Sequence, residues 1–294
     1  MADHPLVIDV SLARRLVAER FPDHAGEPVI PVDSSGTDNA IFRLGEAACL
    51  RLPRLASAEA QLVKEFDWLG RLALLPLAIP RPLALTGPFG TFPFHTAVYD
   101  WLPGTAATQE PPADMIVAAQ ALAGFIAALR ERPCADGPAA GRHNQYRGAP
   151  LSLRDAPTRA ALARLSGLVD TDRLSALWSE CLAAPAYEGR GLWLHGDLHA
   201  GNLIVRDGAL SGVIDFGLCG IGDSAVDLIA AWSFFEAPAR QAFRQALSCD
   251  AAEWRRGQGW ALSTAAIALD YYRSSNPTLS GLSLRSLKEL EAGA

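Results

Sequence analysis

The 294-residue chain has little cysteine, almost no lysine and no long hydrophobic run, and each shortage excludes a class of protein. Its five cysteines are scattered, odd in number and never spaced Cys-x-x-Cys, which argues against a disulfide framework and a zinc ribbon. The longest mostly apolar stretch, residues 115–129, is interrupted by Gln120 and is shorter than the roughly 18 residues of a membrane span. Residues 1–10 lack the basic start and apolar segment of a secretory signal. We therefore expect a cytoplasmic protein without a membrane partner.

Basic runs are also absent, since none is longer than Arg255-Arg256 and the net charge is -6. This balance predicts no nucleic-acid partner and mildly favours a cationic ligand. Of the 26 basic residues only Lys64 and Lys288 are lysines, which is typical of a codon bias towards arginine. Half of the residues are hydrophobic, so the chain is an ordinary globular protein of one large or two modest domains.

The first third of the chain predicts a small antiparallel sheet with helices. Ser11 is expected to cap a first helix, and a second helix is expected over residues 57–75, ended by Pro76. Short apolar runs separated by turn residues predict strands. These runs lie at residues 29–32, 40–44, 48–52, 83–85 and 94–99.

From residue 105 onward the pattern is mainly helical, after a hinge near residues 99–104 that contains WLPGT. Residues 137–157, rich in Gly, Pro and polar side chains, are expected to form a flexible loop. Helices are expected at residues 114–130, 171–183, 223–235, 239–247 and 253–271. The sequence therefore predicts an α+β, bilobal protein: residues 1–104 form the sheet lobe and residues 105–294 the helical lobe.

Residues 192–217, LWLHGDLHAGNLIVRDGALSGVIDFG, place five polar side chains among apolar runs. Residues 203–205 and 210–214 resemble two strands joined through Asp207-Gly208, a dipeptide that favours the positive φ angles of a tight hairpin turn. If the turn is centred, Asn202 lies opposite Val213, and Asp215 follows about 7 Å further along the strand. The hairpin thus brings Asn202 and Asp215 to one end.

Asp197 precedes Asn202 by five residues on a glycine-containing loop and can reach the same space. Two carboxylates and an amide oxygen suit magnesium, which keeps waters and pairs with phosphate, and one carboxylate remains available as a base. Two alternatives stay open. His195-x-Asp197-x-His199 could ligate zinc, or the polar residues could have structural roles only, as a buried histidine and an asparagine that caps a turn.

The motif His195-Gly196-Asp197-Leu198-His199-Ala200-Gly201-Asn202, followed thirteen residues after the Asn by Asp215-Phe216-Gly217, resembles the kinase-like aminoglycoside phosphotransferase family. Protein kinases show the same spacing between H-R-D-x-x-x-x-N and D-F-G. Glycine in place of arginine after the histidine, and the later Gly222-Asp223-x-x-x-Asp227-Leu228, are similar to the small-molecule branch. The resemblance covers nearly the whole chain and implies the bilobal protein-kinase-like fold.

The resemblance implies a role for each matching residue. Asp197 would be the catalytic base that accepts the proton of the attacking hydroxyl. Asn202 and Asp215 would hold magnesium at the nucleotide phosphates, while His195 and Asp227 would support the catalytic loop. The expected cofactors are ATP, with GTP as an alternative, and Mg²⁺.

The N-terminal lobe would then bind the nucleotide. Ser34, Ser35 and Gly36 lie in a turn between two predicted strands, where small residues let backbone N–H groups approach phosphates. The family's phosphate-binding lysine is replaced by Arg51, whose guanidinium has a different geometry. Arg54 is a second candidate for the phosphate contact. The remaining expected nucleotide-site residues are Glu65, as acidic partner of Arg51, and Tyr99 and Trp101 at the hinge.

The acceptor is less well indicated by the sequence. It is expected to be a small hydroxylated molecule, with an aminoglycoside-type antibiotic preferred and a macrolide, peptide antibiotic, sugar or amino alcohol as alternatives. Candidate acceptor-binding residues are Asp270, Tyr271 and Tyr272, with Glu236, Trp232 and Trp260 as further candidates.

The sequence also allows two other classes of protein. A protein kinase is disfavoured because the chain passes almost directly from Gly217 to the helix expected at residue 223, without room for an activation loop. A nucleotide-binding pseudokinase is suggested by Arg51, and the retained Asp197 argues against it.

Overall fold

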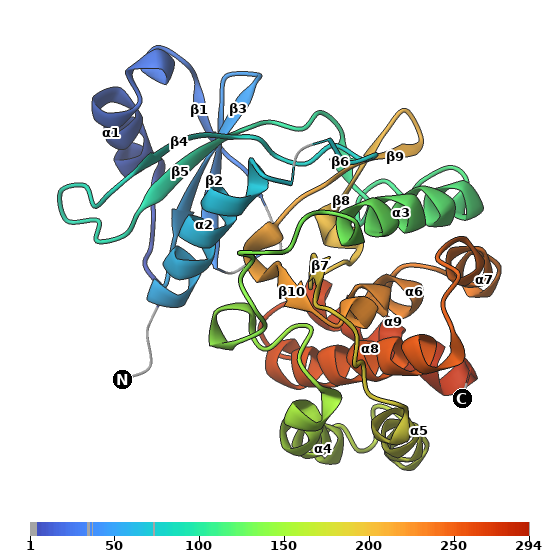
Figure 1. Cartoon of the computed structure of the whole chain (residues 1–294). Coiled ribbons are helices and arrows are strands. Elements are labelled where there is room, and N and C mark those ends of the chain that lie inside the picture. The colour runs from blue at the N-terminus through green and yellow to red at the C-terminus, as the bar shows by residue number, and fades with distance from the viewer. Residues whose placement is uncertain (1–4, 34–35, 37, 73, 294) are drawn as a thin grey trace. The chain divides into compact units, whose positions relative to one another are not determined.

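The computed structural model describes residues 5–33, 36, 38–72 and 74–293, and its contacts divide the chain into two compact units (Figure 1). The sheet unit comprises residues 1–103 and 212–217, and the helical unit comprises residues 104–211 and 218–294. The sequence-based division at residue 104 grouped residues 212–217 with the helices. They belong to the sheet unit because Gly212 pairs with Ala78, and the Val213 N–H donates to the Ala78 carbonyl at 2.8 Å.

The sheet unit is built on one antiparallel sheet with strand order β1-β2-β3-β5-β4. Alternating buried positions in β2 and β3 place one face of these strands in an apolar core, as expected for a half-covered sheet. The strands are β1 (Val29–Pro31), β2 (Asn39–Leu44), β3 (Ala48–Pro53), β4 (Pro82–Thr86) and β5 (Thr96–Asp100). All five predicted strands are present.

Two α-helices and a short 3-10 turn complete the sheet unit: α1 (Val10–Arg20), η1 (Pro22–His24) and α2 (Ala56–Leu69). Two sequence-based details were wrong. Asp9, not Ser11, caps α1, since its carboxylate accepts from the Leu12 N–H at 2.7 Å. Helix α2 ends at Leu69 rather than residue 75, because Gly70 follows and the chain turns well before Pro76.

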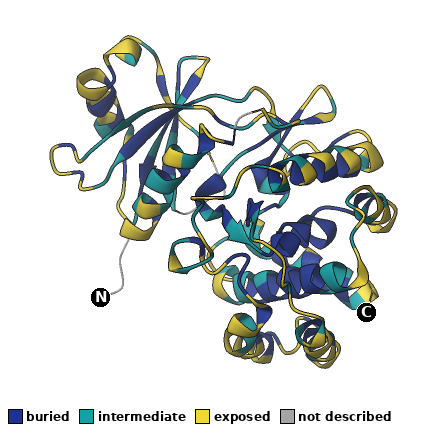
Figure 2. Cartoon of the chain, in the orientation of Figure 1, coloured by how far each residue is buried: buried dark blue, intermediate teal, exposed yellow. Residues whose placement is uncertain are grey.

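The helical unit is organised around α8 (Ala251–Tyr272), in which 11 of 22 residues are buried, so that it forms a central helix rather than a surface one (Figure 2). Helices α4, α5 and α9 pack against it. The other α-helices are α3 (Met115–Arg130), α4 (Asp155–Arg164), α5 (Thr171–Ala183), α6 (Ala230–Ser233), α7 (Ala237–Ala246) and α9 (Pro277–Gly293). None of the described helices is long and apolar enough to cross a membrane.

Short strands and 3-10 turns carry the polar motif. Strand β7 pairs with β10, and β8 lies between β6 and β9. The strands are β6 (Thr105–Ala106), β7 (Leu192–Leu194), β8 (Leu203–Arg206), β9 (Ala209–Val213) and β10 (Gly220–Gly222). The 3-10 turns are η2 (Arg142–Asn144), η3 (Leu151–Arg154), η4 (Ala200–Asn202), η5 (Phe216–Leu218) and η6 (Ser224–Ile229).

Predictions from the local sequence pattern were wrong for several segments of the helical unit. The helix expected over residues 223–235 is a 3-10 turn followed by the four-residue α6. The loop expected over residues 137–157 contains η2, η3 and the start of α4. Helix α9 and the two-to-three-residue strands β6, β7 and β10 were not predicted, because such short strands have no periodicity of their own.

Candidate active site

The predicted hairpin is present as β8 and β9, joined through Asp207 and Gly208. Both turn residues have positive φ, 55° and 74°, as a two-residue turn that matches the strand twist requires. Glycine at the second position adopts this conformation without steric cost. The hairpin therefore forms for the local reason that the sequence indicated.

The loop after β7 carries the catalytic motif and depends on Gly196. Its φ is 85°, and a Cβ atom there would lie 2.7 Å from the Leu218 carbonyl oxygen and 3.2 Å from the Arg147 Cβ. Only glycine meets both the conformational and the steric requirement. A side chain at this position would displace the neighbouring Asp197.

Asp227 holds this loop from η6. Its fully buried carboxylate accepts the backbone N–H of His195 at 2.9 Å and that of Gly196 at 2.7 Å. Burial raises the pKa of Asp227, and the charge of His195 and the two backbone N–H groups oppose that shift. The buried His195 completes the arrangement, since its Nδ1 accepts the Asp197 N–H at 3.2 Å.

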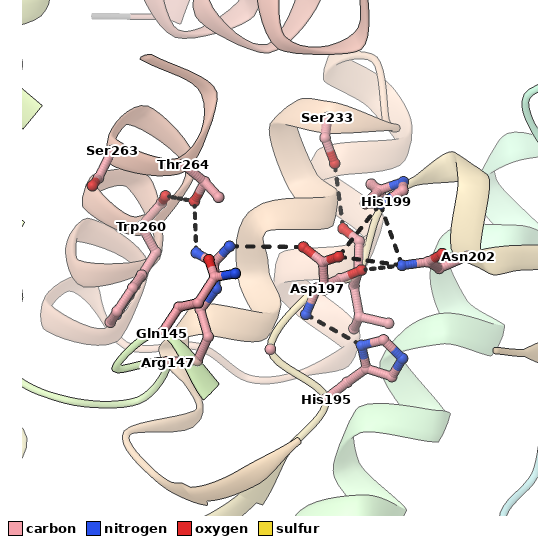
Figure 3. A network of polar contacts seen from close by, with 12 residues as sticks. Gln145, Arg147, His195, Asp197, His199, Asn202, Ser233, Trp260, Ser263 and Thr264 are labelled. Carbon is pink, nitrogen blue, oxygen red and sulfur yellow. Dashed lines mark hydrogen bonds and ion pairs between the residues drawn. The ribbon is translucent and has the colours of Figure 1, made fainter. Parts of the chain in front are cut away.

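Asp197 is the point at which the polar contacts of the helical unit converge (Figure 3). Its side chain is 31% exposed, so a substrate can reach the carboxylate. His199 Nε2 lies 3.6 Å from Asp197 Oδ2, and Arg147 Nη2 lies 3.8 Å from Asp197 Oδ1. The Gly201 N–H donates to His199 Nδ1 at 3.0 Å, which leaves the proton of a neutral His199 on the nitrogen that faces Asp197.

These neighbours determine the protonation state of Asp197. Burial alone would raise the pKa of its carboxyl, but the contact with His199 and the charge of Arg147 outweigh burial and hold the pKa far below its ordinary value. Asp197 is therefore ionised at neutral pH. An ionised carboxylate that is open to solvent can accept a proton from a substrate hydroxyl.

Asn202 lies at the end of η4 and is 7% exposed. Its amide nitrogen donates to the Asp197 carbonyl at 2.9 Å and faces Asp197 Oδ2 at 3.5 Å. This orientation leaves the amide oxygen as the atom available to a hard cation. The donor type of Asn202 therefore fits magnesium.

The zinc alternative finds no support in the geometry. Among residues 5–33, 36, 38–72 and 74–293, no three His, Cys, Asp or Glu side chains are arranged to hold a metal ion. The backbone N–H of Asp197 also occupies His195 Nδ1. The polar contacts of the motif thus converge on the carboxylate of Asp197, and the described residues do not form a zinc site with two imidazole ligands.

A second polar cluster lies within the sheet unit. Arg51 Nη1 donates to both carboxylate oxygens of Glu65 at 2.7 Å, and Arg51 Nη2 donates to Asp215 Oδ1 at 3.3 Å. Asp215 has a φ of 65°, a left-handed conformation that is rare outside glycine and typical of functional sites. Arg51 thus joins the acidic residue of α2 to the predicted metal ligand.

Burial and charge oppose one another in this cluster. Burial raises the pKa of Glu65, and the charge of Arg51 counteracts that shift. For Arg51 itself, burial lowers the pKa, but Glu65 and Asp215 reverse the effect and raise it. Arg51 therefore remains a cation.

The remaining nucleotide-site candidates lie in varied surroundings. Tyr99 is 1% exposed, with the Arg51 guanidinium 5.7 Å from its ring centre. Trp101 is half-buried beneath Arg43, and its N–H donates to the Ala47 carbonyl. Arg54 donates to the Leu6 carbonyl at 3.2 Å. Gly36 is exposed, whereas Ser34 and Ser35 lie outside the described residues.

The acidic residues expected to meet an amine-rich acceptor are already paired. Asp270 forms an ion pair with Arg164 at 2.7 Å, and Glu236, 77% exposed, lies 4.0 Å from Arg285. Tyr271 is 73% exposed and packs edge-to-face on Tyr272, whereas Trp232 and Trp260 are buried.

Arg147 contacts the predicted catalytic motif directly, although the sequence did not indicate it as a site residue. Arg147 is 4% exposed and lies between Asp197 and Thr264, to whose Oγ1 it donates at 3.3 Å (Figure 3). It belongs to the segment that was predicted to be a flexible loop. The only signal in the sequence is a run of polar residues at 142–147, which does not distinguish a site residue from a surface one.

The fold and the geometry around Asp197 define a kinase-like phosphotransferase. The phosphotransferase enzyme family matches residues 29–260, and the chain belongs to this family. Its class of activity is therefore phosphoryl transfer to a small molecule.

Solved structures confirm the expected fold class. The GDP complex of aminoglycoside 2'-phosphotransferase-IIIa aligns with a TM-score of 0.76 at 18% identity, covering 97% of this chain and 99% of that one. An ADP-bound aminoglycoside phosphotransferase aligns with a TM-score of 0.61 at 16% identity, covering 97% and 99%. The macrolide 2'-phosphotransferase apoenzyme from Brachybacterium faecium aligns with a TM-score of 0.59 at 20% identity, covering 95% and 97%. A search among curated proteins gives no significant match.

Proposed function

We propose that this enzyme transfers the γ-phosphoryl group of ATP to a hydroxyl group of a small molecule, with Asp197 as the base. The observation that carries the proposal is the Asp197 carboxylate. It is ionised and 31% exposed, and Asp227 holds its loop through two backbone hydrogen bonds. Asp197 would accept the hydroxyl proton while the oxygen attacks the γ-phosphorus and ADP leaves.

Asn202 and Asp215 are proposed as the magnesium ligands. The amide oxygen of Asn202 is left available by its hydrogen bonds, and the carboxylate of Asp215 is 48% exposed with a single contact to Arg51. When bound, magnesium would neutralise charge on the nucleotide phosphates. His195 is proposed as support for the loop, since its ring accepts the Asp197 N–H.

The nucleotide is proposed to lie on the residues predicted for it: Ser34, Ser35 and Gly36, Arg51 with Glu65, and the segment of Tyr99 and Trp101. Arg51 would present its charge to the phosphates while Glu65 keeps the guanidinium in place. ATP is the proposed donor. GTP is the alternative, because one similar structure is a GDP complex and another is ADP-bound.

The acceptor is proposed to be a hydroxylated small molecule. Likeness to a kanamycin complex, a gentamicin complex and a macrolide phosphotransferase supports an antibiotic and a role in resistance. The pairing of Asp270 with Arg164 weakens the case for Asp270 as a partner of a cationic acceptor.

The test is phosphoryl transfer by the whole chain with ATP or GTP, with and without Mg²⁺, against a mixed panel of aminoglycosides, macrolides and hydroxylated metabolites. Mass spectrometry would detect acceptors that gain one phosphoryl group. Asp197→Asn should lower the rate by about 10²–10⁴-fold and leave the far-UV circular dichroism unchanged.

Asp207→Asn is the matched control, because Asp207 is a carboxylate that is 91% exposed in the hairpin turn. It should transfer at the parent rate. Full activity of Asp197→Asn would contradict the mechanism.

A binding protein without turnover is the second candidate, because both terminal nitrogens of Arg51 contact protein carboxylates. That candidate predicts ATP binding by calorimetry with no phosphorylated product and no ADP release. Nucleotide turnover that depends on Asp197 would exclude it.

A further inference from the structure

A basic cluster lies beside Asp197 in the helical unit and is formed by Arg147, Arg154 and Trp260. The two guanidinium carbons lie 5.9 Å and 5.7 Å from the centre of the Trp260 ring, so the two positive charges share one aromatic neighbour. Arg147 is 4% exposed, and Arg154 and Thr264 are half-buried. The cluster thus places one cation, Arg147, beside the base, and a second, Arg154, at the same indole ring.

The positive charges of the basic cluster are poorly compensated. Within the described part of the chain, the Arg147 guanidinium donates one hydrogen bond, to Thr264 Oγ1 at 3.3 Å, and it lies 3.8 Å from the carboxylate of Asp197. Its Nε and the indole N–H of Trp260 are buried without an acceptor among the described residues. A guanidinium offers five N–H donors, and burying them unpaired is costly.

Arg154 has no acidic partner in the described part of the chain. Its Nε donates to Ser263 Oγ at 3.1 Å, and its Nη1 faces the Gln145 carbonyl at 3.5 Å. Burial and then the charge of Arg147 lower the pKa of Arg154 to about 10, whereas no carboxylate raises it. The charges of Asp197 and Asp227 compensate that of Arg147 only in part, since burial still lowers its pKa, and neither carboxylate acts on Arg154.

The backbone that presents Arg147 is strained. Gln145 and Tyr146 have φ values of 52° and 59°, two consecutive left-handed residues that are not glycine. Such conformations are unfavourable and persist only where the surroundings enforce them. Asn144 supplies that support, since it is buried and its amide donates to the Arg147 carbonyl at 3.1 Å. The unpaired N–H donors of the basic cluster, presented by a strained backbone, together indicate a ligand-binding site.

We propose that the acceptor carries a carboxylate, which the N–H groups of Arg147 and Arg154 bind while its hydroxyl faces Asp197. This proposal rests on the proposed phosphotransferase function and narrows its substrate class. A planar carboxylate matches the fork of a guanidinium. Because Arg147 lies 3.8 Å from Asp197, a carboxylate and a hydroxyl that hydrogen-bond to these two side chains would lie no more than roughly 9 Å apart, and a short hydroxy acid fits within that limit.

The test compares acids with their methyl esters, which differ in the charge of the carboxyl group. The probes are glycerate, 4-hydroxybutyrate and L-serine, with kanamycin as the cationic comparison. Calorimetry on the full chain without nucleotide would give each Kd. At least one acid should bind about tenfold or more tightly than its ester, and it should be phosphorylated when ATP and Mg²⁺ are added.

Three variants separate an anion site from a structural ion pair. Arg154→Gln should raise the Kd of the preferred acid about tenfold and leave that of its ester unchanged, while Arg154→Lys should recover part of the affinity. Arg159→Gln is the matched control, because Arg159 lies on α4, the helix that follows Arg154, and pairs with Asp155 at 2.7 Å. Its Kd values should equal those of the parent. Arg147→Gln should also weaken binding of the acid.

Two results would overturn the proposal: no acid in the panel binds more tightly than its ester, or Arg154→Gln leaves the preference unchanged. If the proposed phosphotransferase function is wrong, neither ATP binding nor ADP release would occur. This result distinguishes failure of that function from failure of the anion site. Acid-selective binding that depends on Arg154 would support the anion site even in that case.

Discussion

At the scale of single residues, the substitution of arginine for the expected lysine is the most informative departure from the family pattern. Arg51 contacts both oxygens of Glu65 and one of Asp215, which a single ammonium on a flexible stem would not do with the same geometry. Its charge therefore stabilises two acidic residues within the sheet unit. The guanidinium proposed to bind the nucleotide therefore also supports the stability of the sheet unit.

Arg51→Gln should destabilise the protein by about 3–5 kcal/mol, because it leaves Glu65 buried without its cation. Arg51→Lys should cost less, since the charge remains. Thermal unfolding followed by circular dichroism would measure both. Arg54→Gln, which removes a single contact to the Leu6 carbonyl, is the control. Equal melting temperatures for Arg51→Gln and Arg54→Gln would contradict the expectation.

Arg147→Gln should make activity more sensitive to acid. Arg147 helps to hold the pKa of Asp197 below its ordinary value, so the base stays ionised as the pH falls. Without Arg147 that pKa rises towards about 3.9, and activity should begin to fall at a higher pH. Profiles of kcat/KM against pH for parent, Arg147→Gln and Arg159→Gln would show this. Coincident acidic limbs would argue against the electrostatic role of Arg147.

At the scale of structural elements, a loop, a 3-10 turn and a hairpin hold the catalytic motif. The loop after β7 is anchored by Asp227 of η6, and the hairpin of β8 and β9 follows it directly. The Asp227 carboxylate accepts backbone N–H groups that would otherwise be buried without a partner. The position of Asp197 therefore depends on a residue thirty positions later in the chain.

Asp227→Asn should lower activity and stability together. An amide has one acceptor oxygen, so one of the two N–H groups of His195 and Gly196 loses its partner, at a cost of about 1–3 kcal/mol. The loop would shift and kcat should fall more than the KM for ATP rises. Steady-state kinetics and thermal unfolding would be compared with Asp136→Asn, an exposed carboxylate. A variant with parent kcat would show that the loop does not need this anchor.

At the scale of the whole molecule, the proposed ligands come from both units. Asn202 belongs to the helical unit and Asp215 to the sheet unit. The test of these two proposed ligands therefore uses the whole chain.

ATP with Mg²⁺ should raise the melting temperature. At a nucleotide concentration of 100 times Kd the stabilisation is about 2.7 kcal/mol, or roughly 5–10 °C for a chain of this size. ATP with EDTA should give a smaller shift, and Asp215→Asn should lose the magnesium-dependent part while Asp207→Asn retains it. A magnesium-dependent shift that survives in Asp215→Asn would remove Asp215 from the metal site.

The parts of the fold that were predicted correctly have local causes. The strands of the sheet unit follow from alternating apolar positions, and the β8–β9 hairpin follows from Asp207-Gly208. The short strands were not predicted because their two or three residues show no decisive pattern, and the 17-residue helix α9 was not predicted either. Helix α2 was predicted too long, because the apolar run beyond Leu69 continued after the backbone had turned at Gly70.

The predicted catalytic motif can be recognised from the sequence alone, because the spacing of Asp197, Asn202 and Asp215 is a property of the chain and the two turn residues suffice to form the hairpin. The electrostatic environment of that motif, in contrast, depends on the tertiary structure. Arg147, 50 residues before Asp197, and Trp260, 63 residues after it, meet beside the base through packing of a strained loop on α8. Charge and burial depend on neighbours in space, and neighbours so distant in sequence leave no local pattern.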